Sequence, residues 1–332
     1  MPPPDPLAVF TRICSDATLA AGWRRVRRNG GGAGGDGETP QAFARDLTGS
    51  IRRLSRELRE GCYRPGPLRS WVIAKPGGGV RRLAVPPVRD RVAQSAAVII
   101  LAPLVESRMS RASFAYRAGL SVEQAAALVT FYRLRGFTWV VDGDIADFFP
   151  SILHAPLRAR FVEAVDCQRT RDLIALWLAA FSPAGRGLAQ GAPLSPLLSN
   201  LALADVDRAV DSRKVRLVRY ADDFLLMTRT RPEAEAAAAR LAELLRPLGL
   251  TLNAAKTRIA HLDEGIRFLG YRFERDRILR SEWARSSTRA GPRAASSPCS
   301  SGQTLRLTAR VTVYRAVSFP SSSGQPRRRI EL

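Results

Sequence analysis

Lysine, histidine and cysteine are scarce in this chain of 332 residues, and each shortage narrows the chemistry available to it. Only three of the 52 basic residues are lysines, at positions 75, 214 and 256, so almost every positive charge is carried by arginine. Arginine suits fixed bidentate contacts with phosphate, whereas lysine is a compact charge that can also release a proton. The four cysteines have no CxxC spacing, which argues against a zinc site and favours reduced thiols in the cytoplasm.

Long apolar runs are also absent. The longest uncharged apolar stretch, residues 92–105, is too short to span a bilayer and contains Pro103. The first ten residues, MPPPDPLAVF, lack the basic and apolar regions of a signal peptide, so we expect no export. We therefore expect no membrane partner, and the formal net charge of +22 points to another polyanion, nucleic acid.

Two adjacent carboxylates interrupt an apolar stretch at residues 218–227, VRYADDFLLM. The flanking residues favour extended backbone, and Ala221, Asp222 and Asp223 fall where a tight hairpin would turn. Neighbouring carboxylates repel each other and lose hydration when partly buried, so one of them tends to be protonated unless a cation is bound. A solvated turn would explain this stretch taken alone, because Asp-Asp pairs are common in turns.

A third carboxylate has similar surroundings upstream, in residues 138–154, TWVVDGDIADFFPSILH. A short buried-strand signal at residues 139–141 ends in Asp142, Gly143 and Asp144. If this strand lies beside the hairpin, Asp144 joins the other two acids in one small volume. Such hard oxygen ligands suit Mg²⁺, and two ions roughly 3.5–4 Å apart would activate an attacking hydroxyl and stabilise the leaving oxygen.

A second hairpin is predicted near the N-terminal third of the chain, with strands at residues 71–74 and 82–85. Lys75 and Arg81 flank its glycine-rich turn. Such a basic pair could fold over a triphosphate and neutralise the charge that grows during phosphoryl transfer. Two solvated surface bases would give the same pattern.

Apolar residues at helical spacing predict several helices around these hairpins. The predicted ranges are 7–28, 43–59, 90–104, 170–181, a helix starting near 196, and 232–246. Together with the hairpins, these helices indicate an α+β fold.

Three ordered blocks now permit a comparison: DGDIADFF at residues 142–149, GLAQGAPLSPLLSNLAL at 187–203 and YADD at 220–223. They resemble the palm of reverse transcriptases, most closely the group II intron-like bacterial branch. A lone YADD would be weak support, but the ordered set at comparable spacing is strong. The resemblance implies a right-hand polymerase with fingers and an antiparallel palm sheet covered by helices. No thumb is recognisable in this sequence, so we expect the thumb to be missing or degenerate.

The activity implied by this resemblance is that of an RNA-directed DNA polymerase, a nucleotidyltransferase. It would add dNTPs to the 3′-hydroxyl of a DNA or RNA primer on an RNA template, using two Mg²⁺ ions, with Mn²⁺ as a substitute. Phe149 would lie against the sugar of the incoming nucleotide and exclude a 2′-hydroxyl. Lys256 would protonate the pyrophosphate leaving group, for which lysine is better placed than arginine.

Other residues receive roles from the same resemblance. Catalysis would rest on Asp144, Asp222, Asp223 and Lys256; the metal ligands would be the three aspartates and the backbone carbonyl of Ile145; nucleotide contacts would come from Lys75, Arg81, Phe149, Gln190 and Gly191; and template or primer contacts would come from Arg117, Asn200, Tyr220 and Gly270.

The chain divides into four predicted parts: a basic helical extension at 1–62, fingers at 63–137, a palm at 138–275 and a basic tail at 276–332. The tail is rich in Ser, Arg, Pro and Gly without apolar periodicity, so we expect disorder there. It departs from the intron-encoded pattern, which continues into a helical thumb.

The biological role stays open at this point. Residues 63–86 are similar to reverse transcriptases linked to CRISPR spacer acquisition, which implies antiviral defence and a CRISPR adaptation integrase as a partner. Two other functions also stay open: a catalytically impaired RNA-binding remnant of a reverse transcriptase, and another template-dependent nucleotidyltransferase.

Overall fold

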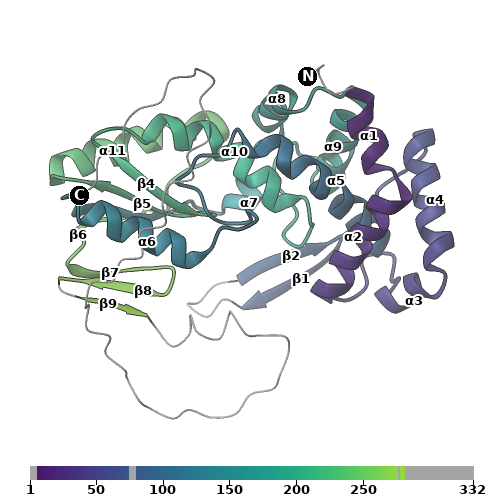
Figure 1. The fold of residues 1–332 in the computed structure, drawn as a ribbon, viewed down its shortest axis with the longest axis horizontal. Helices are drawn as coiled ribbons and strands as arrows, with labels where there is room; N and C mark the ends of the chain where they lie inside the picture. The colour runs from purple at the N-terminus through teal and green to yellow at the C-terminus, as the bar shows by residue number, and fades with distance from the viewer. Residues whose placement is uncertain (1–5, 75–79, 276, 281–332) are drawn as a thin grey trace, which may run out of the picture. The chain divides into compact units, whose positions relative to one another are not determined.

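The structure, a computed structural model, describes residues 6–74, 80–275 and 277–280, which all belong to a compact unit spanning Met1–Ala290. Helices and strands are mixed along it, which confirms the expected α+β class (Figure 1). Lys75 and almost all of the predicted tail lie outside the described residues. The tail prediction is wrong at its start, because Arg277–Arg280 forms strand β9, which pairs with the preceding strand.

Each of the first two predicted helices is in fact two helices. The N-terminal part contains α1 (Pro6–Ile13), α2 (Asp16–Asn29), α3 (Pro40–Arg45) and α4 (Leu47–Glu60). Ser15 begins α2 by accepting a hydrogen bond from the Thr18 N–H, and Asp46 begins α4 in the same way. Short polar side chains compete with the helical backbone for its own hydrogen bonds, so they start new helices where apolar spacing alone suggested continuity.

The long helix α5 (Val88–Glu106) forms the centre of the N-terminal half. Most of its residues are buried, and α2 approaches it so closely that a Cβ on Gly22 would lie 2.5 Å from the Val92 carbonyl oxygen. Next to it, β1 (Arg69–Ala74) and β2 (Val80–Val85) form the predicted antiparallel hairpin. The side chains of Trp71, Val72 and Ile73 on this hairpin are exposed.

A four-stranded antiparallel sheet forms the second half, in the order β4 (Arg216–Tyr220), β5 (Asp223–Thr228), β3 (Trp139–Asp144) and β6 (Arg258–His261). Helices α11 (Arg231–Leu245) and α6 (Val122–Arg133) lie on opposite sides of it (Figure 1). Because side chains alternate along a strand, Val141 and Leu226 pack in the α11 core while Val140 and Leu225 pack in the α6 core.

The remaining elements lie between β3 and β4 along the chain or follow α11. They are α7 (Phe148–Ser151), α8 (His154–Ala164), α9 (Gln168–Phe181), α10 (Ser195–Val210), the short 3₁₀ turn η1 (Arg246–Leu248), β7 (Glu264–Phe268) and β8 (Tyr271–Glu274). Strands β7, β8 and β9 form a separate three-stranded sheet. Among the described residues, no helix has the length and apolar character needed to cross a bilayer. Cys14 and Cys167 are buried free thiols, whereas Cys62 is exposed.

Candidate active site

The three predicted acids meet at one end of the central sheet. Asp144, the last residue of β3, lies opposite Asp223, the first residue of β5, in the antiparallel register. The Ile145 N–H donates to the Asp222 carbonyl oxygen at 3.4 Å, so Ile145 lies beside the turn that joins β4 to β5. The predicted hairpin and the convergence of its acids with Asp144 are therefore confirmed.

Crowding of these acids changes their proton affinity. Loss of hydration raises the pKa of Asp222; its own backbone N–H opposes this rise, and the neighbouring Asp144 carboxylate adds to it. Although Asp223 is exposed as a residue, desolvation of its carboxyl group and the charges of Asp222 and Asp144 raise its pKa to about 6. The ionised forms are thus unfavourable together, and a bound cation would relieve both desolvation and repulsion.

Lys256 lies at the same place. Its Nζ is 2.8 Å from Oδ2 of Asp144, and this hydrogen bond raises the pKa of the lysine. Asn253, which the sequence analysis missed, fixes the other side of Asp144: its backbone N–H donates to the Asp144 carbonyl at 2.8 Å, and its amide lies 3.4 Å from the same Oδ2. An asparagine three residues before the lysine, at a turn between apolar runs, was the available signal.

The donor chemistry of this site fits a hard divalent cation. Three carboxylates and the backbone of Ile145 lie together, and neighbouring carboxylates help to raise the pKa of Asp222 and Asp223, as expected of a cation-binding site. Nevertheless, in the described part of the chain no three His, Cys, Asp or Glu side chains are already arranged as a metal cluster. Oδ2 of Asp144 faces the Lys256 ammonium instead, so binding of a cation requires these side chains to adjust.

Gly143, between the two acids of β3, was also missed as a site residue. A Cβ on Gly143 would lie 2.6 Å from the Phe224 ring and 3.1 Å from Oγ1 of Thr257. The residue before it, Asp142, is paired with Arg258 on β6 and has a raised pKa caused by burial. Glycine is therefore needed for the close packing that places the Asp144 end of β3 against β5.

Two of the predicted nucleotide-binding residues, Gln190 and Gly191, lie against strand β2 of the N-terminal hairpin. Gly191 has φ +122°, and a Cβ there would meet the Val85 side chain at 2.8 Å, so only glycine permits this approach to β2. The Gln190 carbonyl accepts from the Ala84 N–H at 2.7 Å, while the buried Oε1 of Gln190 has no hydrogen-bond partner among the described residues. The backbone of Arg81 lies in β2, opposite Ile73. The described residues do not include Lys75.

Phe149 lies on α7, next to this region. Its ring packs edge-on against Phe148, with centroids 5.6 Å apart, and its carbonyl accepts from the Leu188 N–H at 2.8 Å. A cavity of about 500 Å³ is lined by the hairpin, by α7 and by the loop that contains Leu188 and Gln190. Its rim carries Trp71 and two arginines, Arg82 and Arg186. The three acids do not line this cavity.

The residues predicted to contact template or primer do not share one environment in the structure. Tyr220 is half-buried at the end of β4, and Gly270, with φ +79°, forms the β7–β8 turn with Leu269. The Arg117 guanidinium is bound by Glu106 and by the carbonyls of Ser110 and Ser113.

Asn200, which was also predicted to contact template or primer, lies in the interior of the protein. It is 2% exposed, and its amide donates to the Ala115 carbonyl at 2.8 Å. Its Oδ1 accepts from Nη1 of Arg219 on β4 at 3.1 Å, so both ends of the Asn200 amide are bound by protein groups, one of them in the loop between α5 and α6.

Comparisons with known proteins agree with this geometry. A family described as reverse transcriptase (RNA-dependent DNA polymerase) matches residues 73–273. Protein YkfC of Escherichia coli (strain K12) is 29% identical over 304 residues, covering 77% of this chain and 79% of its own length. The group II intron-encoded protein LtrA of Lactococcus lactis subsp. cremoris is 30% identical over 191 residues, which cover 55% of this chain and 31% of that protein.

A similar solved structure is a chain of a partial Cas6-RT-Cas1--Cas2 complex. It has 27% sequence identity and a TM-score of 0.43, and the match covers 71% of this chain and 40% of that one. The family match by itself spans more than half of the 332 residues and includes all three converging acids. The chain therefore belongs to the reverse transcriptase family, the RNA-directed DNA polymerases.

Proposed function

We propose that this chain extends a DNA or RNA primer with dNTPs on an RNA template by phosphoryl transfer assisted by two divalent cations. The observation that carries the proposal is the convergence of Asp144 with Asp222 and Asp223 at one end of the central sheet. In this proposal residues 63–137 serve as fingers, residues 138–275 as palm and residues 1–62 as a basic extension. The net charge of +22 supports nucleic acid as the substrate.

In the proposed mechanism the three aspartates and the Ile145 carbonyl would hold Mg²⁺, or Mn²⁺ in its place. Bound cations would supply Lewis-acid activation of the primer hydroxyl and charge neutralisation at the leaving oxygen. Lys256, whose Nζ is already beside Asp144, would keep its proton available for the pyrophosphate. Phe149, supported by its neighbour Phe148, would limit the space beside the sugar of the incoming nucleotide.

Primer extension on poly(rA)/oligo(dT) tests the proposal. Asp222→Asn should lower the extension rate by about 10²–10³-fold, because one preorganised group at a reacting centre contributes this much. Asp166→Asn is the matched control, since the Asp166 side chain is 90% exposed and pairs only with Arg171 among the described contacts. An inactive parent that still binds RNA would instead identify an RNA-binding remnant.

Sugar selection separates this activity from that of another template-dependent nucleotidyltransferase. Phe149→Val removes the bulky ring from α7 and should increase the use of ribonucleotides relative to dNTPs. The ratio of kcat/KM for dTTP and UTP measures the change. A parent that prefers UTP would contradict the assignment as a DNA polymerase.

We also propose a role in antiviral defence through CRISPR spacer acquisition, supported by the resemblance of residues 63–86 and by nothing else in the chain. Co-purification with a CRISPR adaptation integrase encoded in the same genome tests this role. Failure of the two proteins to associate at physiological salt would remove it and leave the polymerase proposal unaffected.

A further inference from the structure

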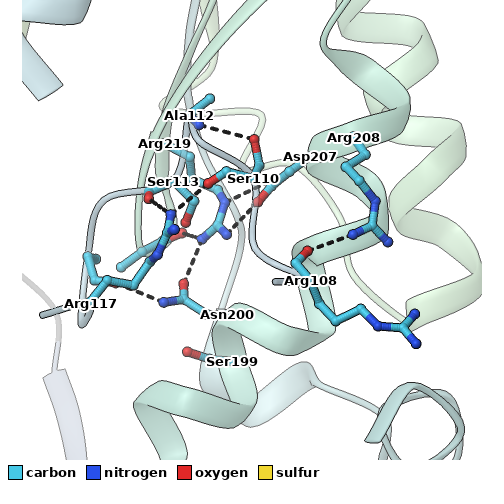
Figure 2. Close-up of polar contacts among 12 residues, drawn as sticks. Arg108, Ser110, Ala112, Ser113, Arg117, Ser199, Asn200, Asp207, Arg208 and Arg219 are labelled. Carbon is cyan, nitrogen blue, oxygen red and sulfur yellow. Dashed lines mark hydrogen bonds and ion pairs between the residues drawn. The ribbon is translucent and has the colours of Figure 1, made fainter. Parts of the chain in front are cut away.

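A buried arginine lies three residues before Asp222. Arg219 on β4 and Asp207 on α10 are each 2% exposed, and they form a bidentate ion pair. Nε of Arg219 is 2.7 Å from Oδ1 of Asp207, and Nη2 is 2.6 Å from Oδ2 (Figure 2). Two charges removed from water in this way contribute little net stability, so their presence calls for another reason.

The third nitrogen of the guanidinium contacts the catalytic turn. Nη1 of Arg219 donates to the Ala221 carbonyl at 2.8 Å and to Oδ1 of Asn200 at 3.1 Å. Asn200 is itself fixed, because its amide donates to the Ala115 carbonyl. Asn200 and Asp207 are seven residues apart, two turns of α10, so one face of this helix holds both ends of the guanidinium (Figure 2).

Ala221 needs such a restraint. Its φ is +60°, in the left-handed region, where the Cβ of an L-residue crowds the backbone. The carbonyl that Arg219 binds belongs to the peptide unit joining Ala221 to Asp222. The nitrogen of that same unit is bonded to Cα of Asp222, from which the carboxylate side chain extends. Fixing the oxygen of a planar peptide unit also fixes the direction of its N–Cα bond, so the orientation passes from Arg219 to Asp222.

The backbone of Arg219 is also fixed, by hydrogen bonds to the loop after α5. The Arg219 N–H donates to the Ala112 carbonyl at 2.8 Å, and the Arg219 carbonyl accepts from the Phe114 N–H at 3.0 Å. Arg117 secures this segment by donating to the Ser110 and Ser113 carbonyls (Figure 2). The guanidinium therefore starts from a backbone that cannot shift without breaking several hydrogen bonds.

We infer that Arg219 is a positioning residue: held by Asp207 and Asn200, it fixes the Ala221–Asp222 peptide unit and thereby the orientation of the Asp222 carboxylate. This inference rests on the proposed function, in which Asp222 is a metal ligand. Arg219 itself touches neither the substrate nor the cation. Lysine cannot replace it, because an ammonium group lacks the planar fork that serves Asp207 and Ala221 together.

Arg219→Lys tests the inference, with Arg216→Lys as the matched control on the same strand. Arg216 is partly exposed and forms a long ion pair with Asp211, with 3.8 Å between Nη1 of Arg216 and Oδ1 of Asp211. The metal readout is Mn²⁺ binding, followed by electron paramagnetic resonance in a complex whose primer ends in a 3′-deoxynucleotide, so that no reaction occurs. We expect Arg219→Lys to weaken Mn²⁺ binding about 10–100-fold, as loss of a residue that orients a metal ligand does.

Steady-state kinetics provide the second readout. We expect kcat of Arg219→Lys to fall about 100-fold, the effect of misplacing a reacting group by about 1 Å, with the KM for primer–template unchanged. A merely structural role would lower the folded fraction, measured by circular dichroism, and leave both Mn²⁺ affinity and kcat per folded molecule at the parent values. That result would overturn the inference.

A gentler variant keeps the test decisive if Arg219→Lys does not fold. Asn200→Ser retains the ion pair and removes one partner of Nη1, so Mn²⁺ binding should weaken by about threefold to tenfold, the effect of one hydrogen bond. Unchanged binding would overturn the inference. If the parent neither binds Mn²⁺ nor extends a primer, the proposed function fails instead. If the parent is active and the Arg219 and Asn200 variants behave like it, the positioning role fails and the proposed function stands.

Discussion

At the residue scale, the site combines groups that destabilise one another. Asp222 and Asp223 both have a raised pKa, caused first by desolvation and then by neighbouring carboxylates. An acid whose pKa is raised by folding makes the native state less stable at neutral pH, where the carboxylate is ionised. In the proposed function such acids are retained for their chemistry, and we expect neutral substitutes to stabilise the fold.

We therefore predict that Asp222→Asn is more stable than the parent in EDTA at neutral pH, by about 0.5–2 kcal/mol. Addition of Mg²⁺ should raise the melting temperature of the parent and leave that of the variant almost unchanged, because only the parent binds the ion tightly. Thermal unfolding followed by circular dichroism measures both effects. A variant less stable than the parent in EDTA would show that the Asp222 carboxylate has favourable partners that outweigh its desolvation.

At the element scale, α5 is held by a buried acid. Asp90, 1% exposed, accepts from the Tyr63 hydroxyl at 2.6 Å and from the Gly66 N–H at 2.7 Å. The Tyr63 hydroxyl also accepts from Nε1 of Trp177 on α9. Desolvation raises the pKa of Asp90 from 3.8 to about 6, against the effect of these hydrogen bonds. One carboxyl group thus connects α5, α9 and the segment before β1.

The raised pKa of Asp90 gives a signed pH dependence. Between pH 3.8 and about 6 the folded protein keeps the proton that the unfolded chain releases, so stability falls as pH rises through this range. The difference amounts to roughly 3 kcal/mol. We predict that Asp90→Asn flattens this part of the curve of unfolding free energy against pH, measured by urea titration. Asp166→Asn, at an exposed position, should keep the parent slope; an equal slope in Asp90→Asn would contradict the prediction.

Elements also show how far the sequence could predict the structure. Both hairpins were predictable, since period-two patterns and turn residues are local signals, and the order of the acidic blocks predicted that Asp144 meets Asp222. The breaks at Ser15 and Asp46 were not, because apolar spacing continues across them. The hydrogen-bond and ion-pair partners of individual residues were the least predictable feature.

Asn200, Arg117 and Arg219 illustrate this limit. Nothing in the local sequence shows that Asn200 is buried or that Glu106 pairs with Arg117. Only Arg219 carried a signal: it follows two apolar residues in a strand, and a charged residue must find a partner when it is buried. The pairing with Asp207 depends on how α10 packs against β4, which is a property of the tertiary fold.

At the scale of the whole molecule, positive charge dominates. A net charge of +22 over 332 residues attracts the phosphates of any nucleic acid, whatever its sequence. Arginine carries almost all of this charge, so many contacts can be bidentate.

We predict strongly salt-dependent binding of the primer–template. For six to ten phosphate contacts the affinity should fall roughly 10³–10⁵-fold between 50 and 200 mM salt. Fluorescence anisotropy with a labelled primer–template measures the slope of log affinity against log salt concentration. Asp222→Asn should keep this slope, because the turn contributes no basic side chain; a shallow slope in the parent would show that apolar contacts dominate.

The thiols of the molecule offer a route to following such binding. Burial raises the pKa of the Cys14 thiol to about 12, so Cys14 presents no reactive thiolate near neutral pH. Cys167 is 2% exposed, so a reagent cannot reach it in the folded protein. Cys62, just after α4, is exposed. With Cys299, which lies outside the described residues, replaced by serine, a maleimide dye should attach once, at Cys62, and report on the arrival of labelled RNA by energy transfer.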